Sequence, residues 1–135
     1  MEARKLATVQ QLSPNLSAVG LRVFFNICDS WKLKNEQEMV LLGSPSRSSF
    51  FKWKKDPHSA SLSKDTLERI STILGIYKSL QILLPEPAAA DQWVSKPNTA
   101  ALFGGQSALD RMLSGNVSDL YVVRQYLDSA RGGWA

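Results

Sequence analysis

Residues 63–84, SKDTLERISTILGIYKSLQILL, are the stretch around which the rest of the chain can be organised. Apolar residues recur there at helical spacing in two adjacent stripes: Leu67, Ile70, Leu74 and Tyr77 in one, and Ile73, Ile76, Leu80 and Leu84 in the other. A band of this width predicts a helix that is buried on more than one side. Ser63 can cap its first amides, and Pro85 ends it. Gly75 in its middle indicates a bend or a close helix contact, because glycine costs about 1 kcal/mol there relative to alanine.

Composition limits the classes of protein to consider. The chain has 135 residues, of which 44% are hydrophobic and 21% are charged, which excludes a disordered chain and predicts one domain or two small ones sharing a core. No apolar run approaches the roughly eighteen residues of a membrane span. The start, MEARKLATVQQL, lacks the apolar centre of a secretory signal. Cys28 is the only cysteine, which fits a reducing, cytoplasmic location.

The positive charge is concentrated in the first part of the chain. Residues 1–60 carry nine Lys/Arg and five Asp/Glu, whereas residues 61–135 carry seven of each. A basic segment on one side of a protein indicates an anionic partner, most often nucleic acid, although such clusters are also common as solvated surface.

The segment before residue 63 has the pattern of a helix-turn-helix. We expect a loose leader over residues 1–12, a helix over 14–31, and a short helix that begins with a capping box at Asn35 and Glu38. Gly43 suits the turn that follows. A second short helix then runs from Ser44-Pro45 to Lys55, so the DNA-binding part is predicted to span residues 13–62.

The second short helix has the residues that DNA recognition requires. Its small polar start would approach base edges, with Arg47 as a bidentate donor, and its lysines would contact phosphates. The predicted DNA-binding residues are Ser46, Arg47, Ser48, Ser49, Lys52, Lys54 and Lys55. Phe50 and Trp53 would face inward. The competing interpretation is a three-helix bundle with an incidentally basic surface.

The part after the central helix, residues 85–135, is predicted to contain three more helices. A short alanine-rich helix would follow Pro85 and end near Trp93, and a turn-rich loop would cover residues 95–105. Within that loop, Leu102 and Phe103 are expected to insert into the core. Short helices are then expected at 107–114 and from Asn116 or Ser118 to Ala130. The final segment, Arg-Gly-Gly-Trp-Ala, places Trp134 near the end of the sequence, where it must fold back on its own domain or contact a partner.

Catalysis is not expected. His58 is the only histidine, so a Ser-His-Asp or HExxH arrangement lacks its components. One cysteine gives no zinc-ligand spacing, and the turn Gly104-Gly105-Gln106-Ser107 is not followed by the lysine of a phosphate loop. We therefore predict no enzyme activity, no catalytic or metal-ligating residue, and no cofactor.

Nearly the whole chain, from about residue 13 to 134, closely resembles antitoxins of the Xre/MbcA/ParS class. The similar runs are LLGSPSRSSFFKWKK (41–55), LSKDTLERISTILGIYKSLQILLPEPAAADQWVSKPN (62–98) and LFGGQSALDRMLSGNVSDLYVVRQYLDSARGGW (102–134). The second half is the more specific, because helix-turn-helix modules occur in many unrelated proteins. Ala108, where many relatives have proline, is a departure from the pattern.

The resemblance implies an all-α protein with two binding functions. The N-terminal part would bind the operator of its own operon as a dimer. The C-terminal part would bind a neighbouring toxin, most often a RES-domain enzyme that destroys NAD, and the C-terminal segment would block the toxin's active site. The implied toxin-binding residues are Phe103, Gly104, Arg124, Arg131, Gly132, Gly133 and Trp134.

Two other functions fit the residues. A transcription regulator whose second half only dimerises or senses a small molecule would bind DNA without any toxin. An interaction scaffold that has lost DNA binding would show no salt-dependent affinity for the upstream region.

Overall fold

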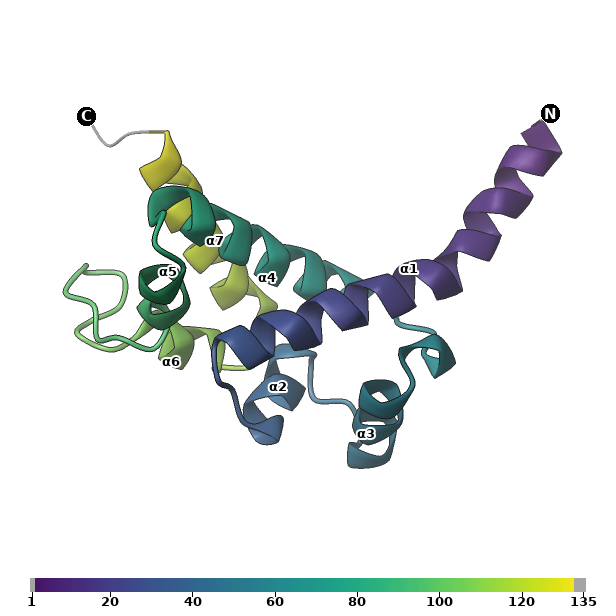
Figure 1. Cartoon of the computed structure of the whole chain (residues 1–135), viewed down its shortest axis with the longest axis horizontal. Helices are drawn as coiled ribbons and strands as arrows, with labels where there is room; N and C mark the ends of the chain where they lie inside the picture. Colours follow the sequence, from purple (N-terminus) through teal and green to yellow (C-terminus); the bar gives the residue numbers. More distant parts are fainter. Residues whose placement is uncertain (1, 133–135) are drawn as a thin grey trace.

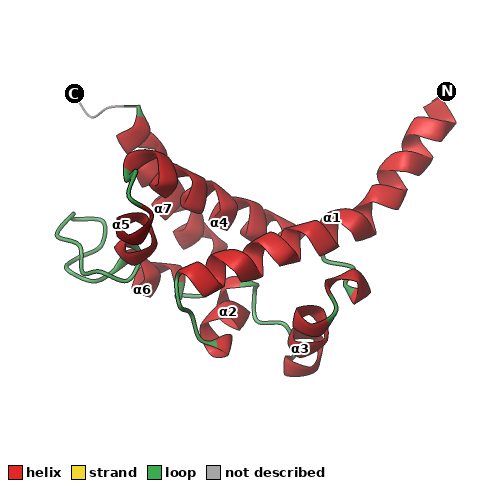
Figure 2. Cartoon of the chain, viewed as in Figure 1, coloured by secondary structure: helices red, strands yellow, loops and turns green. Residues whose placement is uncertain are grey.

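The computed structural model describes the backbone of residues 2–132 and the side chains of residues 16–132. This part of the chain is helical, with seven α-helices and one 3-10 turn (Figure 2), as the sequence predicts. The helices in chain order are α1 (Glu2–Ser30), α2 (Asn35–Leu41), α3 (Arg47–Lys55), α4 (Lys64–Leu83), α5 (Pro87–Trp93), α6 (Ala108–Met112) and α7 (Val117–Arg131), with the 3-10 turn η1 (Pro57–Ser59) between α3 and α4. No helix within residues 2–132 is both long and apolar enough to cross a membrane.

Helix α4 is the central element of the fold. It packs mainly against α7 and α1, with α2 and α3 below α1 and with α5 and α6 at the opposite end (Figure 1). The Ser63 hydroxyl accepts a hydrogen bond from the Thr66 amide over 3.1 Å, which confirms the predicted cap. The four largest apolar side chains that α4 buries are Ile70, Ile73, Ile76 and Leu80. Because α1 and α7 both cover α4, its apolar band is wide.

One continuous core joins the two halves of the chain. It includes Phe24 from α1, Phe50 from α3, Ile73 from α4 and Val123 from α7, each fully buried. The predicted parts 13–62 and 85–135 therefore share their apolar interior, and α4 is the element that both of them cover. A substitution at a buried position of α4 would therefore affect the packing of both halves.

Helix α1 is longer than predicted. It begins at Glu2, so the expectation of a loose leader over residues 1–12 is wrong for residues 2–12. The N-terminal end of α1 projects away from the other helices (Figure 1). The expected start at residue 14 follows from Pro14, which favours the first turn of a helix, but a proline can also lie inside a helix at the cost of one backbone hydrogen bond. The apolar spacing that continues through this proline is the signal that was missed.

The remaining boundaries agree with the sequence within a few residues. Helix α2 begins at Asn35 itself, and its cap is the residue before, Lys34. The Lys34 amide donates to Gln37 Oε1 over 2.8 Å, so Asn35 and Glu38 do not form the predicted capping box. Helix α3 begins at Arg47, after a cap by Ser46. Helix α6 has a capping box between Ser107 and Asp110. Asn116, and not Ser118, precedes α7.

Candidate functional site

The turn between α2 and α3 has the tight geometry that the sequence predicts. Gly43 adopts a φ of +92°, and Ser44 follows with a φ of +60°. A left-handed conformation at Gly43 is accessible because glycine has no Cβ. Two left-handed residues in succession form the turn between α2 and α3.

The start of α3 presents short polar side chains to solvent. The Ser46 hydroxyl accepts a hydrogen bond from the Ser49 amide over 3.1 Å and also contacts the Ser49 hydroxyl. Ser48 is exposed. Ser46 and Ser49 therefore stabilise the helix start, and the exposed positions that remain for base contacts are Arg47 and Ser48.

Arg47 is exposed and weakly held. Its Nη1 lies 3.8 Å from Glu36 Oε1, and 65% of its side chain and 72% of that of Glu36 are exposed. Its guanidinium also lies 5.2 Å from the centre of the Phe51 ring. An exposed ion pair of this kind contributes roughly 0–1 kcal/mol, so Arg47 can exchange Glu36 for another partner at little cost.

The buried face of α3 anchors it to the rest of the protein. Phe50 is fully buried and meets the Phe25 ring edge-on at 5.9 Å, so the prediction that Phe50 faces inward is confirmed. Trp53 is half-buried and packs against the same core. Lys52 and Lys55 lie exposed on the other side of the helix.

Lys54 is bound within the protein, in contrast to Lys52 and Lys55. Its Nζ donates to Asn35 Oδ1 over 2.7 Å and to Glu38 Oε1 over 3.0 Å. Only 2% of the Glu38 side chain is exposed. Burial raises the pKa of Glu38, while the hydrogen bond and the charge of Lys54 oppose that rise. The Lys54 ammonium therefore compensates a buried carboxyl and holds α2 against α3, a role that the sequence analysis missed.

A second polar surface lies at the C-terminal end of α7. Arg124, Asp128, Arg131 and Gly132 line a shallow depression of about 430 Å³. Arg124 Nε lies 3.7 Å from Asp128 Oδ2, and Arg131 Nη1 lies 4.0 Å from Asp128 Oδ1. Two arginines around one partly exposed carboxylate leave a net positive, solvent-accessible surface.

Helix α4 contributes one buried hydrogen-bonding residue to this arginine surface. Ser79, fully buried on α4, donates its hydroxyl to Asp128 Oδ1 over 2.9 Å, and Arg131 Nη1 lies 3.3 Å from the same hydroxyl. The structure therefore brings together Arg124 and Arg131, two of the predicted toxin-binding residues. Ser79, which contacts Asp128 and Arg131, is a residue that no sequence pattern singled out.

Phe103 lies in the core and does not reach the surface. Only 5% of it is exposed, and its ring meets Tyr126 at 5.2 Å and Trp93 at 5.9 Å, edge-on in both cases. The expected insertion of Phe103 into the core is confirmed, and its burial argues against a direct contact of this ring with a partner. The neighbouring Gly104 is exposed with a φ of +58° and forms the turn that inserts Phe103. Gly133 and Trp134 lie outside the described residues.

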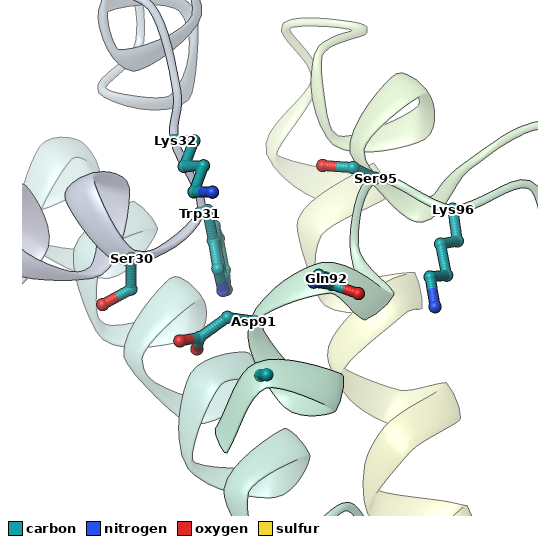
Figure 3. A pocket seen from close by; sticks show the side chains of 8 residues that line it. Ser30, Trp31, Lys32, Asp91, Gln92, Ser95 and Lys96 are labelled. Atoms are coloured by element: carbon teal, nitrogen blue, oxygen red, sulfur yellow. The ribbon is translucent and has the colours of Figure 1, made fainter. Parts of the chain in front are cut away.

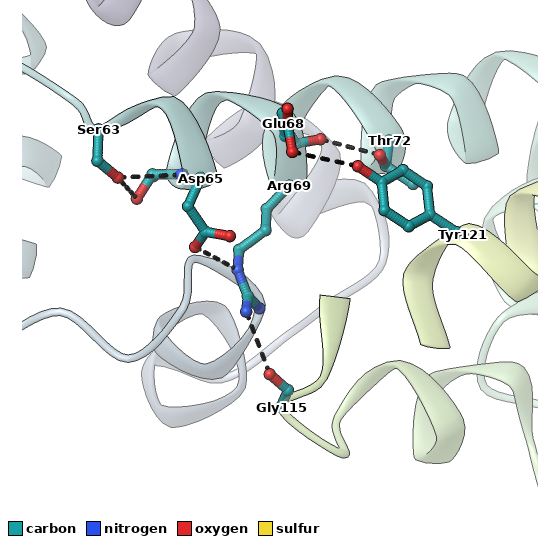
Figure 4. A network of polar contacts seen from close by, with 8 residues as sticks. Ser63, Asp65, Glu68, Arg69, Thr72, Gly115 and Tyr121 are labelled. Atoms are coloured by element: carbon teal, nitrogen blue, oxygen red, sulfur yellow. Dashed lines mark hydrogen bonds and ion pairs between the residues drawn. The ribbon is translucent and has the colours of Figure 1, made fainter. Parts of the chain in front are cut away.

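Arg69, on α4, contacts Asp65 of the same helix and the turn before α7 (Figure 4). Its Nε donates to Asp65 Oδ2 over 2.9 Å, and its Nη2 donates to the Gly115 carbonyl over 3.3 Å. The same Nε lies 3.1 Å from the position that a Cβ at Gly43 would occupy. The guanidinium thus lies between the turn before α3 and the turn before α7. The spacing of Asp65 and Arg69 by four residues was the available signal for the ion pair.

A cavity of about 520 Å³ lies where the N-terminal half meets α5 (Figure 3). Its lining residues are Ser30, Trp31, Lys32, Ala88, Asp91, Gln92, Ser95 and Lys96. The indole Nε1 of Trp31 is buried and has no hydrogen-bond partner among the residues that the structure describes. Because an unpaired buried donor is uncommon, this cavity is the feature that a ligand-sensing protein would use.

Comparisons with known proteins assign a family to each half. Residues 10–75 match the family described as the antitoxin Xre-like helix-turn-helix domain. Residues 79–133 match the family described as the antitoxin Xre/MbcA/ParS C-terminal toxin-binding domain. The chain is also 52% identical over 113 residues to the uncharacterised protein y4oB of Sinorhizobium fredii (strain NBRC 101917 / NGR234), an alignment that covers 84% of each chain.

Proposed function

Since the chain belongs to the antitoxin family that joins an Xre-like helix-turn-helix domain to an Xre/MbcA/ParS C-terminal toxin-binding domain, we propose that it neutralises a RES-domain toxin that degrades NAD and represses its own operon as a dimer. DNA binding, toxin binding and the absence of enzymatic activity follow from the family. The toxin's chemistry, the operator, the dimer and action in the cytoplasm are the proposal.

The DNA-binding part of the proposal rests on the exposed face of α3. Arg47 and Ser48 stand at the N-terminal end of the helix, where a recognition helix contacts bases. Arg47 would donate two hydrogen bonds to a guanine, and Lys52 and Lys55 would contact phosphates on either side. We assign Lys54 to structure, because its ammonium already binds Glu38.

The observation that carries the toxin-binding part is the pair of arginines at the end of α7. Arg124 and Arg131 both pair with Asp128, and Arg131 lies next to Gly132, where the helix ends. A planar guanidinium binds carboxylates and phosphates with two parallel hydrogen bonds. We propose that this end of α7 docks at the mouth of the toxin's active-site cleft and directs the segment from Gly132 to Trp134 into it, which excludes NAD.

Co-expression with the product of the adjacent gene tests this function. We expect the two proteins to co-purify, cell growth to recover, and cellular NAD to return to the level of toxin-free cells. A toxin that is neutralised without any change in NAD would contradict RES chemistry. Absence of co-purification and of rescue with the adjacent product would contradict the pairing itself.

The cavity beside Trp31 favours a second candidate, a regulator that senses a small molecule. Such a protein would change its operator affinity with a metabolite and would ignore the adjacent gene product. The match of residues 79–133 to a toxin-binding domain favours the antitoxin. Operator binding measured with the adjacent product, and separately with a metabolite extract freed of protein, distinguishes the two.

A further inference from the structure

Helix α1 has two apolar faces, and only one of them is used inside the chain. The face toward the core carries Leu21, Phe24 and Cys28, which are fully buried. On the other face Leu16 is 58% exposed and Val19 is 54% exposed. Large aliphatic side chains exposed to this extent and next to each other indicate a contact surface.

This second face opens on a groove between α1 and α4. The groove has a volume of about 420 Å³, and its lining is mostly aliphatic: Leu16, Val19 and Val23 from α1, with Leu67, Ile70 and Leu74 from α4. Leu74 is itself 41% exposed. Gly20 has no side chain to fill the floor of the groove. A Cβ at this position would meet only Ile70 Cγ2, at 3.7 Å.

The sequence of α1 extends the apolar pattern beyond the groove. Val9, Leu12, Leu16, Val19 and Val23 recur at spacings of three, four, three and four. Alternation of three and four is the heptad spacing by which one helix pairs with another helix of the same kind. The structure continues α1 to Glu2, so the first two of these positions lie on the part of the helix that projects from the body (Figure 1).

We propose that the groove binds a second copy of this chain, with the two α1 helices antiparallel. If Leu16 lies on the two-fold axis, Val9 of each copy faces Val23 of the other, and Leu12 faces Val19. All five heptad positions are then buried by the same five positions of the partner, as a two-fold interface requires. This proposal rests on the dimer of the proposed function and specifies its interface.

The projecting end of α1 is the reason for choosing a second copy and this orientation. Residues 2–15 would extend about 21 Å as a helix, and an isolated helix of that length is marginal in water. Antiparallel pairing places this end along the groove of the partner, where it covers Leu67 and Leu74 as well as Val19. Parallel pairing would place the two projecting ends against each other and not along the grooves.

Light scattering after size-exclusion chromatography of the full-length chain tests the interface. We expect the wild type to be a dimer and the variant Leu16→Asp/Val19→Asp to show half that molar mass, with a circular dichroism spectrum that loses no more helical signal than the unpairing of residues 2–15 accounts for. Ile82→Asp is the matched control, because Ile82 is 51% exposed on α4 outside the groove. It should remain a dimer.

Cross-linking tests the orientation and does not depend on the folding of the aspartate variant. Under mild oxidation Leu16→Cys should form a disulfide dimer, and a mixture of Val9→Cys and Val23→Cys chains should form a mixed dimer. Val9→Cys alone should not. The native Cys28 does not interfere, because it is fully buried and burial raises the pKa of its thiol far above neutral pH.

Each remaining outcome overturns the proposal in a distinguishable way. A wild-type dimer that persists in the aspartate variant, without these cross-links, would place the interface elsewhere and leave the dimeric repressor intact. A monomeric wild type would refute both the interface and the dimer. Loss of toxin co-purification in the aspartate variant with no loss of mass would assign the groove to the toxin.

Discussion

The guanidinium carbon of Arg124 lies 2.5 Å from the position that a Cβ on Gly75 would occupy. Arg124 belongs to α7 and Gly75 to α4, and these two helices form the largest helix contact of the fold. The missing side chain at residue 75 therefore lets the arginine lie across α4, within reach of Asp128. The close helix contact that the sequence predicted at Gly75 is confirmed, and its partner is a candidate toxin-binding residue.

Gly75→Ala should separate toxin binding from stability. The free energy of unfolding should stay within about 1 kcal/mol of wild type or rise by that amount, because alanine favours the helix and the tip of Arg124 can move aside. Toxin affinity should fall about tenfold, as in Arg124→Ala, because the guanidinium is displaced; tenfold corresponds to about 1.4 kcal/mol. Urea denaturation and titration calorimetry provide the two measurements.

Gly20→Ala is the matched control for helix propensity. A Cβ at Gly20 would meet only Ile70, at an ordinary distance of 3.7 Å, so it should leave toxin affinity unchanged. Unchanged toxin affinity in Gly75→Ala, together with a loss in Arg124→Ala, would show that the position of the guanidinium does not matter.

Lys54→Met should destabilise the fold, whereas Lys55→Met should not. Lys54 compensates the buried Glu38, and removal of one partner from a buried ion pair costs about 3 kcal/mol. Lys55 is exposed, so its replacement should change the free energy of unfolding by less than about 0.5 kcal/mol while it weakens DNA binding. Equal stability of the two variants, measured by urea denaturation at pH 7, would contradict the structural role of Lys54.

The cost of Lys54→Met should depend on pH. The pKa of Glu38 is raised above its ordinary value of 4.5 in the folded protein. Loss of Lys54 removes the hydrogen bond and the positive charge that lower this pKa. A carboxyl group whose pKa is raised in the folded state contributes fully to the free energy of unfolding below about pH 4.5. That contribution is lost as the pH rises through the pKa of the folded state. The variant should therefore approach wild-type stability near pH 4 and diverge toward pH 7. Adding Glu38→Gln should remove that divergence.

Regular features of the fold were predictable because they depend on neighbours in sequence. The cap at Ser63, the left-handed Gly43 and the inward-facing Phe50 each follow from a local pattern, and each is confirmed. The start of α1 differs from the prediction because Pro14 resembles a helix start, whereas the heptad spacing continues on either side of it.

The site could be predicted less completely, because its geometry depends on residues far apart in the chain. Lys54 looks like any other lysine of its cluster until α2 brings Glu38 within 3.0 Å of its ammonium. The loop around Phe103 predicts that its ring inserts into the core, but its partners there, Tyr126 and Trp93, come from distant parts of the chain. Long-range contacts of this kind have no periodic signal in a single sequence.

Arg47→Ala should relax operator specificity without loss of stability. Its ion pair with Glu36 is exposed, so the free energy of unfolding should change by less than about 0.5 kcal/mol. Loss of a bidentate base contact should cost about 1–3 kcal/mol at one operator position. Fluorescence anisotropy with operator and scrambled DNA measures both affinities. Glu36→Gln, which removes the competing carboxylate, should bind operator as tightly as wild type or more tightly. Equal discrimination by wild type and Arg47→Ala would refute the base contact.

Removal of residues 131–135 should leave the protein folded and weaken its rescue of toxin-producing cells. Leu127 is the last fully buried residue described on α7, and Arg131 contacts only the Ser79 hydroxyl and Asp128 within the described part of the chain. The truncation therefore removes no buried apolar contact of the described core, and its melting temperature should stay within a few degrees of wild type. Arg131→Ala in the full-length chain should show a smaller loss of rescue, because the Gly-Gly-Trp segment remains. A truncated protein that is markedly destabilised would indicate that Trp134 folds back on its own domain, and a folded truncated protein with undiminished rescue would exclude the segment from neutralisation.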